Sequence, residues 1–130
     1  MQIGDPYEYK NVVTKEITAG ALGSGGLDIF ATPFLICWME DAASYSKKEQ
    51  LTEGKSSDGT MGNVRHVSPS PSGAEITAKA ELIAISENGK MYTFKVEAYD
   101  NKGLIGEGTH ERAIIDCERF MKKCLAKLED

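Results

Sequence analysis

Residues 30–50 have the sequence FATPFLICWMEDAASYSKKEQ and show the clearest helical pattern in the chain. Thr32 is a good N-cap, and Pro33 suits the first helical position, where its missing N–H is not needed. Apolar side chains then recur at steps of three and four residues, which predicts a helix over Phe30–Gln50. Ile36 and Cys37 widen the apolar face, so we expect other parts of the fold to wrap this helix. The recurring apolar residues are Leu35, Trp38, Met39, Ala42 and Ala43.

Beyond this helix, apolar and polar residues alternate with a period of two. The alternation over residues 75–84 and 92–98 predicts two strands with one wet face each, the first of which buries its even-numbered residues from Ile76 to Ala84. Asn88-Gly89 between them is a hairpin signal. Residues 104–115 form a third strand of this antiparallel meander, and Asp116 then caps a short amphipathic helix.

The remaining segments have weaker patterns. Residues 7–17 and 61–67 are expected to be strands, and residues 51–59 a polar loop. Residues 19–26 hold four glycines, but no Lys-Ser/Thr pair follows them as in a phosphate-binding loop. We expect a mobile surface loop there, close enough to a site to act as a lid.

A long apolar helix followed by a meander of strands predicts an α+β fold in which the sheet curls around the helix. The chain has 130 residues, no internal repeat and no linker, so we predict a single domain over 1–130. Few elements remain to cover the sheet edges and its far face. Self-association as a two-fold dimer is therefore expected.

Charge and cysteine content exclude several classes of function. The net charge is −5, and no basic run interleaves with aromatic residues, so a nucleic acid partner is not expected. No apolar run is long enough to span a membrane, and the first nine residues do not resemble a signal peptide. Three cysteines (Cys37, Cys117 and Cys124) form no CxxC and no disulfide set. We expect buried or half-buried thiols in a cytoplasmic protein.

Glu40 lies inside the apolar helix, where an unpaired carboxylate is unfavourable. A structural carboxylate would have a basic partner at helical spacing, and the helix offers none, whereas Asp41 is expected to face solvent. Both a structural and a catalytic role stay open for Glu40.

Thr32 also has two interpretations. It can cap the helix, or it can stand beside free amides that stabilise an oxyanion. Because Pro33 has no N–H, those amides would belong to Phe34 and Leu35. Thr32 and Glu40 are eight residues apart, about 12 Å along the helix axis. Either they act on different parts of a ligand, or a second copy of the chain completes each site.

The two histidines, His66 and His110, lie 44 residues apart. Zinc needs three or four ligands at convergent spacing, which these histidines and the scattered thiols do not provide. No metal and no cofactor are therefore expected. His66 can be a satisfied hydrogen-bonding residue or a proton-transfer group. No GxSxG elbow or Cys–His arrangement indicates a serine or cysteine hydrolase.

Three motifs in register resemble the fluoroacetyl-CoA thioesterase-like family. The first is Phe30-Ala31-Thr32-Pro33 with Glu40-Asp41-Ala42-Ala43. The second is the spacing of Gly59, His66 and Gly73. The third is residues 106–116, GEGTHERAIID, followed by Arg119-Phe120. The resemblance covers about residues 7–125.

This resemblance implies a hotdog fold and an acyl-CoA thioesterase that works as a homodimer, with its sites at the subunit interface. It implies a catalytic set of Thr32, Glu40 and His66, and places Gly59 and Gly73 near the substrate. Glu40 would attack the thioester carbonyl or activate water. His66 would supply a proton to the thiolate or orient the carboxylate, and Thr32 would help to hold the carbonyl oxygen.

The sequence leaves the acyl specificity, the CoA-binding residues and the function class open. The fluoroacetate-specific member has an aromatic lid, whereas residues 19–26 hold no aromatic, which argues against fluoroacetyl specificity; Phe30, Phe34 and Trp38 could shape an acyl pocket. His110 and Arg112 are structural or touch the CoA phosphates, for which Lys79, Lys95 and Lys102 are further candidates. The alternative functions are a non-catalytic acyl-CoA-binding protein and an acyl-thioester hydratase or dehydratase.

Overall fold

The computed structural model describes residues 3–4, 6–48 and 52–129. These residues form five strands and three α-helices, with short 3₁₀ turns at Lys15–Ile17 and Ala126–Leu128. The elements are β1 (Pro6–Val12), α1 (Ala19–Leu22), α2 (Thr32–Lys48), β2 (Lys55–His66), β3 (Glu75–Ile85), β4 (Met91–Tyr99), β5 (Leu104–Asp116) and α3 (Cys117–Leu125).

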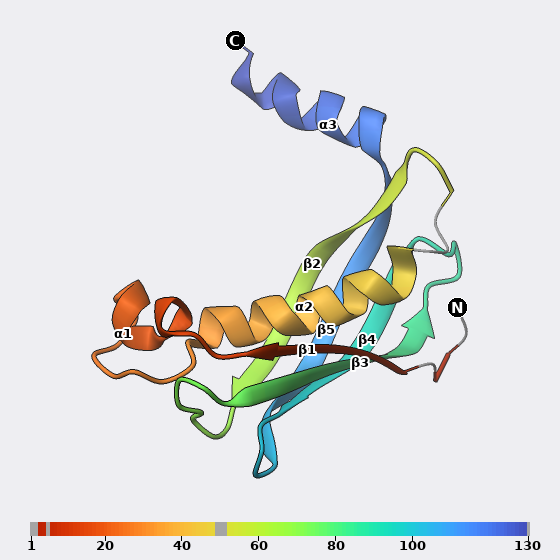
Figure 1. The fold of residues 1–130 in the computed structure, drawn as a ribbon. Helices are drawn as coiled ribbons and strands as arrows, with labels where there is room; N and C mark the ends of the chain where they lie inside the picture. The colour runs from red at the N-terminus through yellow and green to blue at the C-terminus, as the bar shows by residue number, and fades with distance from the viewer. Residues whose placement is uncertain (1–2, 5, 49–51, 130) are drawn as a thin grey trace.

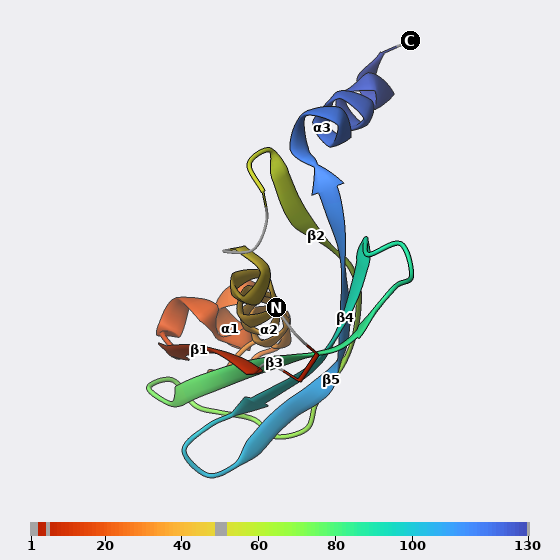
Figure 2. The same ribbon diagram turned by 90° about the vertical axis from the view of Figure 1, so that its right-hand side faces the viewer.

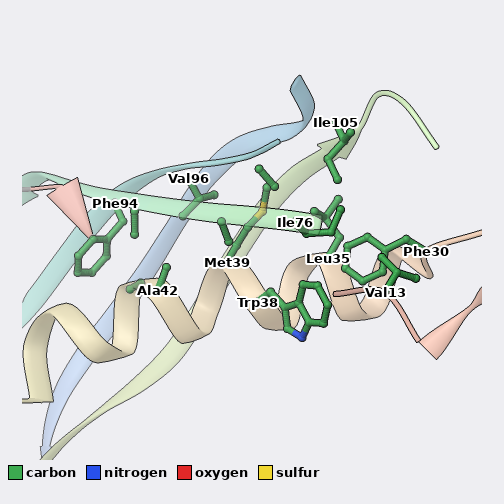
Figure 3. Close-up of a cluster of buried hydrophobic side chains, with 14 of the residues drawn as sticks. Val13, Phe30, Leu35, Trp38, Met39, Ala42, Ile76, Phe94, Val96 and Ile105 are labelled. Carbon is green, nitrogen blue, oxygen red and sulfur yellow. The ribbon is translucent and has the colours of Figure 1, made fainter. Parts of the chain in front are cut away.

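The strands form one antiparallel sheet in the order β1-β3-β4-β5-β2. The sheet curls, and α2 lies in its concave side (Figures 1 and 2). Side chains from α2 and the inner face of the sheet form the core, which Figure 3 shows around Leu35, Met39 and Trp38. The predicted α+β arrangement of a sheet wrapped around one helix is confirmed.

The buried face of α2 is the one that the periodicity predicts. Its five apolar residues Leu35, Trp38, Met39, Ala42 and Ala43 are all buried. The described residues leave the opposite side uncovered, because Thr32, Pro33 and Cys37 are exposed. Within the described residues the sheet therefore wraps the buried side of the helix and leaves the other side open.

Two sequence expectations differ from the observed strands. Ala84 was expected on the buried face of β3, but a register shift between Leu82 and Ala84 leaves it exposed. Such a bulge reverses which side chains face inward. Residues 55–59 were expected in a loop and instead begin β2, where they pair with the end of β5. The polar side chains of residues 55–59 show no alternation that would predict a strand. The strand forms by pairing with β5, which lies far away in the sequence.

Two glycines of β5 allow the strand to lie close to its neighbours. A Cβ at Gly108 would overlap the carbonyl oxygen of Asn63 on β2. A Cβ at Gly106 would lie 2.8 Å from a methyl carbon of Leu35 and 3.2 Å from the terminal methyl of Met39. The motif GEGTHER thus packs β5 tightly against both β2 and α2, and so positions the side chains that follow it.

The short helix α3 extends away from the sheet at the end of β5 (Figures 1 and 2). Asp116 accepts a hydrogen bond from the amide of Arg119 at 3.1 Å, which confirms the predicted cap. The predicted hairpin at Asn88-Gly89 is also observed, with Gly89 in the left-handed region at φ +72°.

Candidate active site

Thr32 and His66 meet at one end of the molecule. Thr32 is the first residue of α2, and His66 is the last residue of β2. The hydroxyl Oγ1 of Thr32 and Nδ1 of His66 are 2.8 Å apart, a hydrogen bond between side chains 34 residues apart in sequence. A hydroxyl next to an imidazole is a common arrangement for proton transfer or for aligning a nucleophile.

Thr32 does not cap its helix. The amides of Phe34 and Leu35 both donate to the carbonyl of Ala31, at 3.0 and 3.1 Å. These two amides were expected to be free for an oxyanion, and that expectation is wrong. The hydroxyl of Thr32 is directed to His66 instead, which removes it from the structural role of a cap.

The second ring nitrogen of His66 has no hydrogen-bond partner in the part of the chain that the structure describes. Its Nε2 is buried and makes no hydrogen bond within the described residues. Phe30 stacks edge-on against the ring, with centroids 6.3 Å apart. Burial lowers the pKa of His66, so the imidazole is neutral near pH 7. A buried ring nitrogen without a partner needs an acceptor or donor from outside this chain.

A hollow of about 370 Å³ opens beside the Thr32–His66 pair. One wall comes from the glycine-rich segment, which forms α1 and then a loop rather than one continuous surface loop. Phe30 lines the hollow, but Phe34 and Trp38 do not. Trp38 packs into the core against Phe30, with ring centroids 4.6 Å apart (Figure 3). The lining residues are Ala19, Ser24, Gly25, Gly26, Leu27, Ile29, Phe30, Thr32, His66, Val67, Ser68 and Pro69.

Glu40 lies in a second cluster, farther along α2. A Cβ at Gly59 of β2 would be 3.2 Å from Cε1 of His110, 3.4 Å from Nη1 of Arg112 and 3.7 Å from Oε2 of Glu40. Glu40 is half-buried, and its carboxylate accepts no hydrogen bond from the side chains and backbone that the structure describes. The basic neighbour that α2 lacks is Arg112 of β5, which periodicity within one helix could not reveal.

Asp41 was expected to face solvent but is half-buried. Burial and the nearby charge of Glu40 raise its pKa, while Arg112 acts in the opposite direction. Arg112 lies near both carboxylates of α2, but no ion pair within 4.0 Å joins it to either among the described residues. Negative charge is concentrated at this turn of the helix.

The remaining predicted substrate residues have different positions. Leu35 is fully buried in the core, and Phe34 packs against it. Gly73 adopts φ +94°, and a Cβ there would meet nothing within 4 Å. Gly73 is therefore needed for its backbone conformation, whereas Gly59 is needed for close approach of side chains.

The thiols and the candidate metal ligands are dispersed. Cys37 and Cys124 are exposed and Cys117 is half-buried, so the expectation of buried thiols is wrong for two of the three. Across residues 3–4, 6–48 and 52–129, no three His, Cys, Asp or Glu side chains are grouped to hold a metal ion. No helix in this part of the chain is long and apolar enough to cross a membrane.

A second hollow, of about 220 Å³, lies between the end of β5 and α3 and was missed by sequence reasoning. Four of its lining residues are basic, Lys55, Lys90, Arg119 and Lys123, and Lys55 is paired with Asp116 at 3.4 Å. The lysines proposed from the sequence for the CoA phosphates do not line this hollow, and one of them, Lys79, pairs with Glu8 at 3.7 Å. The four basic residues that do line it are far apart in sequence and come together only in the fold.

An antiparallel sheet curled around a single long helix is the hotdog architecture. A hot-dog-like protein from Thermanaerovibrio acidaminovorans superposes with a TM-score of 0.90 over 100% of this chain and 95% of its own, at 18% identity, which shows the fold. The family is shown by sequence: the profile of the fluoroacetyl-CoA-specific thioesterases matches residues 13–118, and the chain belongs to this family.

Two relatives of this family are similar to the chain over most of its length. The fluoroacetyl-CoA thioesterase of Streptantibioticus cattleyicolor is 37% identical over 100 residues, 77% of this chain and 70% of the relative. A solved mutant of the fluoroacetyl-CoA-specific thioesterase, in complex with fluoroacetate and CoA, superposes with a TM-score of 0.86 at 32% identity over 92% of this chain and 99% of its own. The protein is thus a thioester hydrolase, an acyl-CoA thioesterase.

Proposed function

We propose that this protein hydrolyses a small acyl-CoA thioester to CoA and the free acid, using Thr32, Glu40 and His66. The observation that carries the proposal is the 2.8 Å hydrogen bond between Thr32 and His66 at the edge of a hollow. The solved relative that binds fluoroacetate and CoA supports an acyl-CoA substrate.

The proposed site is shared between two copies of the chain. Glu40 is about 12 Å from Thr32 along the axis of α2, because eight residues separate them. Within one chain Glu40 is therefore grouped with Gly59, not with His66. The exposed side of α2 and the free outer edge of β2 support association with a second copy. In a two-fold dimer, Glu40 of one copy would complete the Thr32–His66 pair of the other.

The chemistry follows from these groups. Glu40 takes a proton from water while the water oxygen attacks the thioester carbonyl carbon, or Glu40 attacks the carbonyl itself and water opens the resulting anhydride. Thr32 donates a hydrogen bond to the carbonyl oxygen. In the first route the C–S bond then breaks, and His66 relays the proton held by Glu40 to the departing thiolate. In the second route the C–S bond breaks as the anhydride forms, and the proton that the attacking water later loses passes through His66 to the thiolate. In both routes water supplies the hydroxyl of the acid and the proton of the thiol.

The acyl group is small. The hollow beside Thr32 is bounded by Phe30, Leu27 and Val67, and its other wall is glycine-rich. No aromatic residue from segment 19–26 closes it. We therefore propose short acyl-CoA substrates without a special preference for fluoroacetyl-CoA.

The experiment measures thiol release from a panel of acyl-CoAs by the wild type, Glu40→Gln, His66→Ala and an equimolar mixture of the two variants. Each variant alone should be nearly inactive. The mixture should recover about one quarter of the wild-type rate, since about half of randomly mixed dimers are mixed and each holds one intact site.

Four results would contradict parts of this proposal. Full activity of Glu40→Gln would refute the catalytic set, and no recovery on mixing would place the site within one chain. Binding of acyl-CoA without thiol release by the wild type would indicate a binding protein. Addition of water to an enoyl-CoA without release would indicate a hydratase.

A further inference from the structure

Two titratable side chains that the proposed hydrolysis does not use are buried next to Glu40. His110 and Arg112 are two residues apart on β5, and only 3% and 8% of their surfaces are exposed. Burying an imidazole and a guanidinium is unfavourable unless each has hydrogen-bond partners. The hydrogen-bond partners of His110 and Arg112 therefore indicate the role of each side chain.

The hydrogen bonds of His110 determine its protonation. Its Nδ1 is 2.8 Å from the carbonyl oxygen of Met61, and a carbonyl only accepts, so Nδ1 carries the proton. Its Nε2 is 3.2 Å from Nη1 of Arg112, and a guanidinium only donates, so Nε2 is the acceptor. His110 is therefore neutral, in agreement with the lowered pKa that burial gives it.

Arg112 is held at three of its nitrogen atoms. Nε donates to the hydroxyl of Ser57 and Nη2 to the carbonyl of Ser57, both at 2.9 Å. Nη1 donates to His110. Ser57 thus holds one end of the guanidinium and His110 the other. Because the guanidinium is planar and rigid, contacts at both ends fix its plane.

The fixed guanidinium borders the space over Gly59, which pairs with Arg112 in the β2–β5 register. Nη1 of Arg112 and Oε2 of Glu40 lie within 3.7 Å of the same point above Gly59. Among the described side chains, no ion pair within 4.0 Å joins Arg112 to Glu40. Arg112 therefore acts on this space as a fixed positive charge and leaves the carboxylate of Glu40 unbound.

We propose that His110 is a positioning residue: as a neutral acceptor, it holds Arg112 beside Glu40 and the space over Gly59. The inference rests on the proposed function, in which Glu40 acts on the thioester. A fixed cation at this point stabilises the negative charge that develops when the carbonyl is attacked, because it needs no reorganisation during the reaction. His110 borders this space only with the carbon Cε1, because its two ring nitrogens are engaged by Met61 and Arg112.

Two amide variants separate the two hydrogen bonds of His110. His110→Gln can place an oxygen near the position of Nε2 and accept from Arg112. His110→Asn can place its NH₂ near Nδ1 and donate to Met61, but it is too short to reach Arg112. His110→Ala removes both bonds. The assay measures kcat and KM for acetyl-CoA with the full-length protein, together with the melting temperature of each variant.

His110→Asn and His110→Ala should lower kcat by at least about tenfold, the effect of one hydrogen bond to a charged group, while KM changes by less than about threefold. His110→Gln should retain kcat within about threefold of the wild type, even if its melting temperature falls as far as that of His110→Asn. If kcat instead follows the melting temperature across all three variants, or His110→Ala keeps full kcat, His110 is only structural.

Ser57→Ala provides an independent measurement if a His110 variant does not fold. It frees Nε of Arg112 at the opposite end and leaves His110 in place, so kcat should fall with little change in KM. An unchanged kcat would overturn the proposed role of the held guanidinium. A failure of the proposed function can be told apart from a failure of the role of His110. If the proposed function is wrong, Glu40→Gln remains active, whatever the activity of the His110 variants.

Discussion

The hydroxyl of Thr32 lies 2.8 Å from Nδ1 of His66, although one begins the central helix and the other ends the edge strand. This contact joins α2 to β2 at the mouth of a hollow. Glu40 lies two turns of helix farther on, over Gly59. One chain therefore presents a hydroxyl–imidazole pair at one place and a carboxylate–guanidinium cluster at another.

Replacing Thr32 tests the pair directly. Thr32→Ala removes the hydroxyl that meets His66 and should lower kcat by about a hundredfold, the order of one transition-state hydrogen bond. Thr32→Ser keeps the hydroxyl and should retain most of the activity. Thermal unfolding should be nearly unchanged in both variants, because Thr32 is exposed and does not cap α2. Wild-type kcat in Thr32→Ala would contradict its catalytic role.

Gly59 should be sensitive to an added side chain. In Gly59→Ala the new Cβ would lie 3.2 Å from Cε1 of His110, which must move by a few tenths of an ångström, and 3.4 Å from Nη1 of Arg112, at contact distance. We expect a clear loss of kcat and a stability loss of about 1–3 kcal/mol. Gly62→Ala on the same strand is the matched control, because a Cβ there meets nothing within 4 Å. Equal kinetics and stability in the two variants would show that the space over Gly59 is not used.

Leu35 should affect stability rather than substrate binding. Its side chain is fully buried, so Leu35→Ala should lower the free energy of unfolding by about 2–5 kcal/mol. KM for acyl-CoA should change little in the folded protein. Urea unfolding together with steady-state kinetics measures both, and Ile83→Ala, at a site 40% exposed, is the control with a small effect. A raised KM at unchanged stability would restore Leu35 to the substrate site.

Acid should destabilise the protein through its histidines. Burial lowers the pKa of both His66 and His110. Between the ordinary histidine pKa of about 6.5 and the lower folded values, the unfolded chain binds more protons than the folded one. Stability should therefore fall as the pH drops from 7.5 through this window.

Melting temperatures measured from pH 7.5 to 5.5 check this expectation. His66→Gln removes one of the two titrating groups, so its melting temperature should fall less steeply than that of the wild type. Asp100 has a lowered pKa, so it stays ionised over this range and does not contribute to the slope. Identical slopes in the variant and the wild type would show that His66 titrates alike in both states.

Much of the fold was predictable because local patterns carry it. The spacing from Leu35 to Ala43 marks the buried face of α2, and the alternation of Phe94, Val96 and Ala98 marks that of β4. The start of β2 was missed because Ser56 and Ser57 carry no apolar signal. Their strand forms by pairing with Ile114 and Ile115, more than fifty residues away.

The candidate site was predictable as a set of residues but not as an arrangement. The motifs indicated Thr32, Glu40 and His66 through their resemblance to the family. They did not show that the amides of Phe34 and Leu35 donate hydrogen bonds to the carbonyl of Ala31. The acceptor that such an amide finds within one helical turn depends on backbone geometry, which the residue types do not reveal. Nor did the motifs show that Gly73 is needed for its backbone conformation at φ +94°.

The sequence by itself determined a helix with one apolar face, a meander of strands and a family of thioester hydrolases, because periodicity and short motifs are local properties. Only the tertiary structure decided which side chains meet. It brought His66 to Thr32, and it placed His110 and Arg112 beside Glu40, by pairing β2 with β5 and laying α2 across both. Hydrogen bonds and charge interactions depend on separations of a few ångströms, which long-range strand pairing sets and residue order does not.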